Sequence, residues 1–494
     1  MSDRHGPRNK WLGMSAVVLL ASLATLGVHA ESATPDSTDA KPANTLQTLK
    51  ELDGKAPARR HLNIQTWKTA EGAKVMFVEA RELPMFDMRL TFAAGSSQDQ
   101  ATPGIAILTN AMLNEGVKGK DVGAIARGFE GLGADFGNGA YRDMAVASLR
   151  SLSAPDKREP ALKLFAEVVG KPTFPADSLV RIKNQLLAGF EYQKQSPGAL
   201  ASNELSRRLY GDHPYGHPSE GTAKSIPPIT LKQLQAFHAR AYAAGNAVIA
   251  LVGDLSRADA EAIAAQVSAA LPKGPSLPKT VEPTEPKPGE THIEFASKQT
   301  HLLLAQLGIE RDDPDYAALM LGNSILGGGG FGSRLMTEVR EKRGLTYGIY
   351  SGFTAMQARG PFMINLQTRA ELSENTLKLV QDILRDYLAN GPTQKELDDA
   401  KRELSGSFPL STASNSSIVA QLGAIGFYDL PLTFLEDFMQ QAQSVTVEQI
   451  KTAMSKHLNA DKLVIVAVGP TVAQKPLPPP TDRPADRPLG VPEH

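Results

Sequence analysis

An arginine and a tyrosine seven residues apart are the side chains of this sequence best suited to chemistry. Arg340 and Tyr347 lie in GGGFGSRLMTEVREKRGLTYGIYS, the stretch from Gly328 to Ser351. Arginine is permanently charged and carries five donors in fixed geometry, and tyrosine adds a hydroxyl donor on a rigid ring. Such donors suit the carbonyl groups of a bound peptide, or the oxyanion that forms when one of them is attacked. On composition alone, an ion-paired surface arginine and an ordinary strand aromatic are the alternative interpretation.

The composition of the chain excludes several classes of protein. A length of 494 residues is too great for one compact core, so two or more domains are predicted. A formal charge of -1 argues against a nucleic-acid partner, which would require a basic face. The chain has no cysteine, which excludes thiol catalysis and cysteine metal sites.

The first thirty residues are predicted to be a secretory signal peptide. Arg4, Arg8 and Lys10 precede an apolar run from Trp11 to Val28, and the segment ends on the small residue Ala30. This order of basic, apolar and cleavable segments is typical of export. A retained single membrane anchor is the alternative, because the run approaches the length of a span. We expect cleavage, no stable membrane insertion afterwards, and a periplasmic location, which suits a large exported protein without disulfides.

Proline-rich and polar segments divide the remaining chain. We predict a flexible lead-in at 31–47, a linker at 271–290 and a disordered tail at 474–494. Two bodies of similar size remain, at 48–270 and 291–473. They match internally, since AVIALVG ends at Gly253 and LVIVAVG ends 216 positions later at Gly469. Two further pairs of segments, 230–234 with 446–450 and 183–189 with 400–406, match at offsets of 216 and 217, which indicates duplication.

Within each body, short aliphatic runs alternate with longer amphipathic stretches, which predicts an α+β fold with helices packed on a sheet. Strands are expected in the first body at Lys74–Val78, Met88–Phe92, Ala145–Leu152 and Val248–Val252. Helices are expected there at Gly104–Leu113, Lys120–Leu132, Asp156–Val169, Ala176–Gln195 and Leu231–Tyr242.

The string SRLxxxVRExRGLxY around Arg340 and Tyr347 resembles the C-terminal signature of the insulinase/pitrilysin family of zinc peptidases. The resemblance covers nearly all of residues 50–470. It implies two homologous α+β domains of the processing-peptidase-like metallohydrolase fold, each a mainly antiparallel sheet covered by helices, joined by the proline-rich linker. The metal motif of that family is the inverted H-x-x-E-H.

That zinc motif is missing from this chain. Aligning the segment before the first long helix places Ile107 and Ala111 at the histidine positions and Asn110 at the glutamate position. Isoleucine and alanine offer no lone pair to zinc, and asparagine cannot accept a proton near neutral pH. The third ligand position falls at Gly189, although a shifted alignment reaches Glu191. We therefore predict no metal and no catalytic residue in this chain alone.

One pair of nearby histidines was weighed as a separate metal site. His213 and His217 lie in HPYGHP, where the prolines exclude the helix that would bring them onto one face. The family carries a similar turn for structural reasons. The structural interpretation is therefore preferred.

The resemblance implies a function shared between two subunits. In the family's bacterial heterodimers, one subunit carries the zinc motif and the other carries the Arg–Tyr pair, which reaches the zinc site and binds substrate. We predict a zinc-less, substrate-binding subunit of a periplasmic metallopeptidase, inactive alone, whose homologous partner supplies zinc for peptide hydrolysis. A non-enzymatic scaffold or peptide-binding protein on the same fold is the alternative. An independent hydrolase has no motif to support it.

Overall fold

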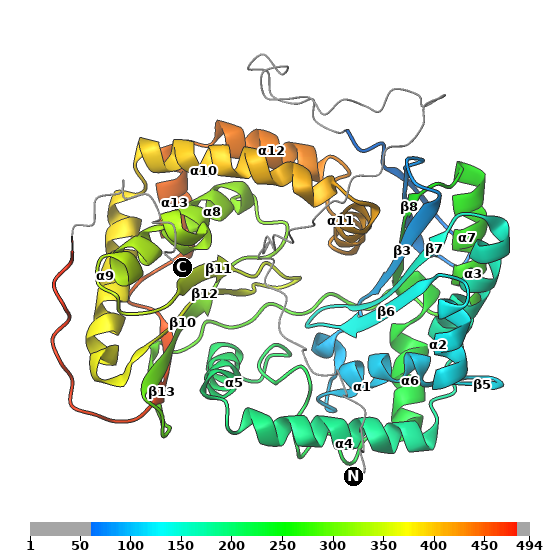
Figure 1. Ribbon diagram of the computed structural model, residues 1–494, viewed down its shortest axis with the longest axis horizontal. Coiled ribbons are helices and arrows are strands. Elements are labelled where there is room, and N and C mark those ends of the chain that lie inside the picture. Colours follow the sequence, from blue (N-terminus) through cyan, green and yellow to red (C-terminus); the bar gives the residue numbers. More distant parts are fainter. Residues whose placement is uncertain (1–60, 482–494) are drawn as a thin grey trace, which may run out of the picture. The chain divides into compact units, whose positions relative to one another are not determined.

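Two sheets with the same strand order form the framework of the protein (Figure 1). The computed structural model describes residues 61–481. The N-terminal sheet has the order β1-β2-β8-β3-β7-β6, and the C-terminal sheet has the order β11-β12-β10-β13-β9. All pairings are antiparallel except the parallel pairs β2–β8 and β13–β9. When β1 is left out and the C-terminal sheet is taken in the reverse order, β9-β13-β10-β12-β11, the two sheets correspond strand for strand. This correspondence supports the duplication and confirms the predicted α+β fold of two homologous halves.

The bounds of the strands in the N-terminal half are β1 (Gln65–Lys68), β2 (Lys74–Glu79), β3 (Met85–Phe92), β4 (Gly116–Val117), β5 (Lys120–Asp121), β6 (Asp135–Ala140), β7 (Ala145–Leu152) and β8 (Ala247–Gly253). Those of the C-terminal half are β9 (Gly289–Glu294), β10 (Gln299–Leu307), β11 (Ile349–Phe353), β12 (Pro361–Arg369) and β13 (Val464–Gly469). The short strands β4 and β5 pair only with each other.

The bounds of the helices in the N-terminal half are α1 (Ile105–Ala111), α2 (Val122–Glu130), α3 (Pro155–Gly170), α4 (Ala176–Gln193), α5 (Pro197–Tyr210), α6 (Leu231–Ala241) and α7 (Arg257–Ala270). Those of the C-terminal half are α8 (Tyr316–Asn323), α9 (Ser373–Asn390), α10 (Gln394–Ser407), α11 (Asn415–Phe427), α12 (Phe434–Ser444) and α13 (Val447–His457). Two π-helical segments, η4 (Ser324–Gly328) and η6 (Met336–Glu341), follow α8.

Alternation along the central strands gives each sheet two apolar faces. In β8, Ile249 and Leu251 join the core formed with the helices of the same half, whereas Val248, Ala250 and Val252 face the other way. Strands that are buried on both faces have continuous apolar sequences. The segments AVIALVG and LVIVAVG are of this kind. The sheets are therefore covered on both faces. The sequence alone had indicated helices mainly on one face.

The second face of each sheet is covered by a helix from the opposite half. Helix α5 packs on β10 and β13, and helix α11 packs on β2, β3 and β8. Glycines let α11 approach closely, because a Cβ at Gly426 would lie 2.5 Å from Val248 Cγ1 and 2.8 Å from Met76 Sδ. The two halves thus exchange one helix each, and each half completes the apolar core of the other.

Equivalent lysines support the duplication and correct one detail of it. Lys183 Nζ donates to Pro227 O at 2.7 Å, and it also contacts the Ile229 carbonyl oxygen. Lys401 Nζ donates to Gln443 O and Val445 O at 2.8 and 2.7 Å. In both halves these carbonyls precede a helix that starts with a Thr-x-x-Gln capping box. The lysines lie 218 positions apart, so the offset of 217 expected for this segment is one residue short.

The expected linker and the described part of the tail largely lack regular secondary structure. Residues 272–288 form neither helix nor strand, as predicted, and β9 begins at Gly289, inside the expected linker. Residues 474–481 also lack regular structure, but Lys475 N–H donates to Glu371 O at 2.7 Å and Thr481 N–H donates to Lys342 O at 2.8 Å. This differs from the expectation of a disordered tail, because these residues are bound to the C-terminal half.

The expected signal peptide at 1–30, the lead-in at 31–47 and residues 482–494 lie outside the described residues. Among residues 61–481, no helix combines the length and apolar character needed to cross a bilayer.

Candidate functional site

Helix α1 carries the positions aligned with the zinc motif, and its start is fixed by a buried aspartate. Asp99 accepts hydrogen bonds from the backbone N–H groups of Gly104 and Ala106 at 2.7 and 2.9 Å. Gly104 has a φ of 94°, a left-handed conformation that glycine adopts without strain. Burial raises the pKa of Asp99 to about 7, while these hydrogen bonds and the charges of Arg142 and Arg240 act in the opposite direction.

The aligned positions on α1 lack the chemistry of a metal site. Ile107 and Ala111 are half-buried hydrocarbons, and Ala111 packs against the N-terminal core. The side chain of Asn110 is 3% exposed, and its Nδ2 donates to Tyr242 Oη at 3.1 Å and to Val146 O at 3.4 Å. Asn110 therefore acts as an internal hydrogen-bonding residue of the core. Ile107 and Ala111 offer no lone pair to zinc, and the amide of Asn110 cannot act as a general base near neutral pH.

The position aligned with the third ligand also has no side chain that could bind a metal, because it is a glycine. Gly189 lies within α4, and a Cβ added there would meet no atom within 4 Å. Glu191, the alternative reached by shifting the alignment, is exposed and pairs with Lys194 at 2.7 Å. Helix α1 does contact α4, so the framework that would bring three ligands together is present while the ligands are not.

The Arg–Tyr pair lies beside an exposed phenylalanine that the sequence did not single out. Arg340 is on η6, and its Cζ lies 4.5 Å from the ring centroid of Phe331 and 5.3 Å from that of Tyr347. Phe331 and Tyr347 are 63% and 90% exposed. The guanidinium therefore makes two cation–π contacts and is framed by two solvent-facing rings.

Among residues 61–481, the guanidinium of Arg340 forms no hydrogen bond or ion pair, and neither does the hydroxyl of Tyr347. Neighbouring arginines differ. Arg334 binds Glu396 through Nε and Nη2 at 2.6 and 2.8 Å, and Arg343 binds Glu338 at 2.8 Å. The role of Arg340 as a site residue stays a prediction, whereas Arg334 and Arg343 have carboxylate partners within the fold. Arg340 retains its full capacity to bind carbonyl oxygen or an anion.

The glycine run before Phe331 combines close packing with an open turn. A Cβ at Gly327 would lie 2.5 Å from Ser351 Oγ and 2.7 Å from Leu335 Cδ1, so only glycine fits there. Gly330 has a φ of +65° and open space around it. The run therefore contains one glycine that close packing requires, Gly327, and one that a left-handed turn favours, Gly330. Phe331 was missed because only the turn and the following π-helix bring it to Arg340, although an aromatic residue inside a glycine run was a visible signal.

The histidines of HPYGHP make separate structural contacts. His213 Nε2 hydrogen bonds with Val281 O at 2.7 Å, whereas His217 Nδ1 contacts Pro218 O at 3.0 Å. Tyr215 of this turn donates to Asp143 Oδ1 at 2.5 Å, and the other carboxylate oxygen of Asp143 accepts the N–H of Gln357 at 2.9 Å. The turn therefore joins the two halves of the chain through a buried carboxylate.

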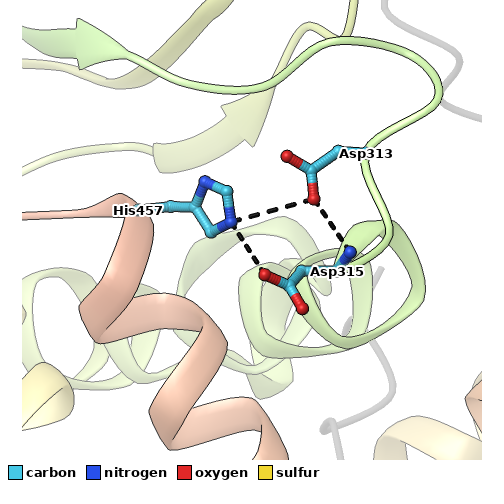
Figure 2. A group of neighbouring side chains, drawn as sticks. All are labelled: Asp313, Asp315 and His457. Atoms are coloured by element: carbon cyan, nitrogen blue, oxygen red, sulfur yellow. Dashed lines mark hydrogen bonds and ion pairs between the residues drawn. The ribbon is translucent and has the colours of Figure 1, made fainter.

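One other group in the described part of the chain has donors close enough for a cation. Figure 2 shows Asp313 and Asp315, before α8, facing His457 at the end of α13. His457 Nε2 lies 3.0 Å from Asp315 Oδ2 and 3.8 Å from Asp313 Oδ1, and Lys456 Nζ lies 2.7 Å from Asp315 Oδ2. Lys456 already pairs with Asp315, and His457 Nε2 lies within hydrogen-bonding distance of the same carboxylate, so we interpret the cluster as polar contacts that join α8 to α13. The prediction that this chain holds no metal stays a prediction.

Two family models match the chain one after the other. The model for Insulinase (Peptidase family M16) matches residues 75–223, and that for the Peptidase M16 inactive domain matches residues 228–404. A crystal structure described as a peptidase M16 inactive domain from Pseudomonas fluorescens is 80% identical, with a TM-score of 0.83 over 84% of this chain and 100% of that one. The chain belongs to peptidase family M16, the insulinase family, and the resemblance recognised in the sequence is confirmed.

More distant relatives carry different names. A Helicobacter pylori protein named "Non-peptidase homolog YmxG" is 28% identical over 80% of this chain and 91% of its own length. A Bacillus subtilis protein named "Uncharacterized zinc protease YmxG" is 24% identical over 76% of this chain and 91% of its own length. The names alone do not assign an activity, so the functional conclusion rests on the residues of the site.

Proposed function

We propose that this chain is the zinc-less, substrate-binding subunit of a periplasmic heterodimeric metallopeptidase of family M16. The observation that carries the proposal is the unpaired guanidinium of Arg340 beside the exposed Tyr347, in a chain whose metal-motif positions hold isoleucine, asparagine and alanine. A guanidinium without an ion-pair partner, held against an exposed tyrosine, suits recruitment to a substrate. The family model for an inactive domain and the relative named a non-peptidase homolog agree with a chain that does not hydrolyse peptides alone.

In this proposal the homologous partner supplies zinc, the activated water and the general base. Arg340 and Tyr347 donate hydrogen bonds to the substrate carbonyl and to the oxyanion that develops from it. Donors that are already oriented toward the oxyanion lower the barrier without further reorganisation. The two rings that flank Arg340 limit the directions in which its guanidinium can point, which favours such orientation.

A peptide-binding or scaffold protein without any catalytic partner is the second candidate, and the name of the Helicobacter pylori relative favours it. A scaffold has no use for an unpaired arginine beside a free tyrosine hydroxyl. The two candidates therefore differ in whether Arg340 and Tyr347 affect turnover.

The test is co-expression with a homologous exported chain that carries H-x-x-E-H, followed by peptide cleavage with and without a chelator. Arg340→Ala and Tyr347→Phe should each lower kcat/KM of the pair by about 10²–10³-fold, the usual cost of losing an oxyanion donor. Zinc content and assembly of the pair should not change. Tyr192→Phe and Arg385→Ala are matched controls, because Tyr192 is 74% exposed on α4 and Arg385 forms surface ion pairs only.

Normal turnover by both site variants would reject the proposed role of Arg340 and Tyr347. Chelator-sensitive proteolysis by the purified chain alone would reject the division of labour between two subunits.

A further inference from the structure

Arg89 on β3 is a desolvated arginine without a partner. Burial lowers its pKa below the ordinary value, and its Nε is sealed from solvent without a hydrogen-bond acceptor. Within residues 61–481, none of its nitrogens forms a hydrogen bond or an ion pair. Its two Nη groups are not among the sealed atoms, so they remain accessible. A charge removed from water in this way is unfavourable unless an anion compensates it.

The nearest carboxylate on the same face of β3 is already used. Side chains alternate along a strand, so Asp87, Arg89 and Thr91 point to one face of the sheet. Asp87 accepts hydrogen bonds from Arg150 Nε and Nη2 at 3.0 and 3.3 Å. The charged pair of Asp87 with Arg150 therefore leaves Arg89 without a counter-ion.

Other arginines of the N-terminal half show what a purely structural arginine looks like here. Burial also lowers the pKa values of Arg142 and Arg240. Arg142 Nη1 donates to His217 O at 2.6 Å, and Arg240 Nη2 donates to Gln98 O at 3.0 Å. The charge of Asp99 acts favourably on both. Arg89 has no acceptor within residues 61–481, and the ionisable group that acts favourably on it is the phenol of Tyr141 rather than a carboxylate.

The surroundings of Arg89 are small and polar. The Oγ1 of Thr91 is also buried without a partner, and Thr91 is 0% exposed. A Cβ at Gly423 of α11 would lie 3.0 Å from Arg89 Cδ and 3.2 Å from Thr91 Oγ1, so a glycine is what lets the helix lie there. Across the sheet, Arg89 pairs in register with Ser148, which in turn pairs with Gly137 on β6. The residues beside Arg89 in this row thus carry little bulk.

We propose that Arg89 binds a carboxylate of the peptide, either the α-carboxylate of its C-terminus or an aspartate or glutamate side chain. This inference rests on the proposed substrate-binding function and adds a second anchoring point to it, on the opposite half of the chain from Arg340. A guanidinium presents two parallel N–H donors that match the two oxygens of a carboxylate.

Equilibrium dialysis of the full-length chain against three hexapeptide pools tests the inference. The first pool lacks Asp and Glu and has free carboxyl termini, the second is the same pool with C-terminal amides, and the third is amidated with one Asp per peptide. At low ionic strength, the wild-type chain should bind the first or third pool about 10- to 100-fold more tightly than the second, as expected for a charge-assisted hydrogen bond. The pool that is favoured identifies the source of the carboxylate.

Arg89→Gln should abolish this discrimination, whereas Arg89→Lys should retain part of it through its charge. Arg385→Gln, which removes an exposed positive charge elsewhere, should leave it unchanged. The unfolding midpoint of Arg89→Gln should equal or exceed that of the wild type, because an uncompensated charge is removed. A clear fall in that midpoint would show that Arg89 is a structural residue and would overturn the inference.

Two negative results have different meanings. If the wild type binds all three pools equally, or if Arg89→Gln still discriminates, the carboxylate site is rejected while the proposed peptide-binding function stands. If no pool binds to the wild type, the proposed function and the inference that rests on it are both rejected.

Discussion

Arg334 and Arg340 are six positions apart and have opposite surroundings. Arg334 binds Glu396 with two hydrogen bonds and lies 4.9 Å from the ring centroid of Tyr387, which is buried. Arg340 has aromatic neighbours too, but both are exposed, and no carboxylate binds it in the described chain. The first arrangement stabilises the fold, whereas the second keeps a charge available for another molecule. At the scale of single residues, this contrast separates a structural side chain from a candidate binding group.

Phe331 is expected to hold Arg340 in place, and its removal tests that role. Phe331→Ala should lower kcat/KM of the subunit pair by about 2- to 5-fold, the factor that corresponds to an exposed cation–π contact. Phe331→Tyr keeps an aromatic face and should preserve activity. The measurement is steady-state peptide cleavage with the zinc-bearing partner. Equal activity of the alanine variant and the wild type would show that Phe331 does not orient Arg340.

Asp99 should make stability depend on pH in a defined direction. Its pKa is raised from 3.8 to about 7, so the folded chain holds this proton up to a higher pH than the unfolded chain does. Its contribution to stability is therefore greatest in acid and falls as the pH rises from about 4 to about 7. Asp99→Asn cannot ionise, and it keeps an acceptor for one of the two N–H groups, because Gly104 and Ala106 bind different carboxylate oxygens.

The free energy of unfolding of Asp99→Asn minus that of the wild type, both measured in urea, should consequently increase as the pH rises from about 5 to about 8. The comparison with the variant removes the effects of titrating groups that do not contact Asp99. His217, whose Nε2 lies 3.9 Å from the carboxylate, does not cancel in this comparison, so His217→Asn is introduced into both chains. A constant difference across this range would contradict the raised pKa.

At the scale of elements, two helical glycines should respond to alanine in opposite ways. Gly426 of α11 is pressed against Val248 and Met76, so Gly426→Ala should destabilise the protein by about 1–3 kcal/mol through overpacking. Gly189 of α4 has open space around it, so Gly189→Ala should stabilise by about 0.5–1 kcal/mol through helix propensity. Urea unfolding measures both changes. The same sign for both variants would contradict the packing described for α11.

The sequence predicted the central elements well because their signals are local. The strand at 145–152 has the predicted bounds, and the predicted helices α1, α2, α3, α4 and α6 end within about two residues of their observed limits. Strand β6 was missed because DFGNGA contains two glycines and few strand-forming residues. The π-helical segment that carries Arg340 was also missed, since a change from one helix type to another leaves no periodic signal. The lack of zinc-binding side chains at the aligned positions followed from residue types alone. The partners of Asn110, and the lack of a partner for Arg89 within residues 61–481, depend on elements far away in the sequence.

At the scale of the whole molecule, the exchange of α5 and α11 makes each half depend on the other. No local pattern shows that α5 packs on β10 and β13, because these strands follow α5 by about 100 and about 260 residues. The duplication could be predicted from matching segments, whereas the exchange required the structure.

Cleavage of the linker tests this dependence in the full-length chain. A protease site inserted between Pro286 and Lys287, in the segment without regular structure, should be cut without separating the halves. The two fragments should co-elute in size-exclusion chromatography and unfold in one transition, since separation would expose the apolar faces that α5 and α11 cover. Fragments that separate under native conditions would show that each half is stable alone.

The hydrogen bonds of Asn110 bear on whether this chain could ever regain hydrolytic chemistry. A longer, charged glutamate at this position would direct its oxygens toward the Val146 carbonyl, where acceptor would meet acceptor, in a place where Asn110 is 3% exposed. Histidines introduced at positions 107 and 111 would leave that conflict in place. Installing the zinc motif in this chain would thus require changes around Val146 as well as at positions 107, 110 and 111.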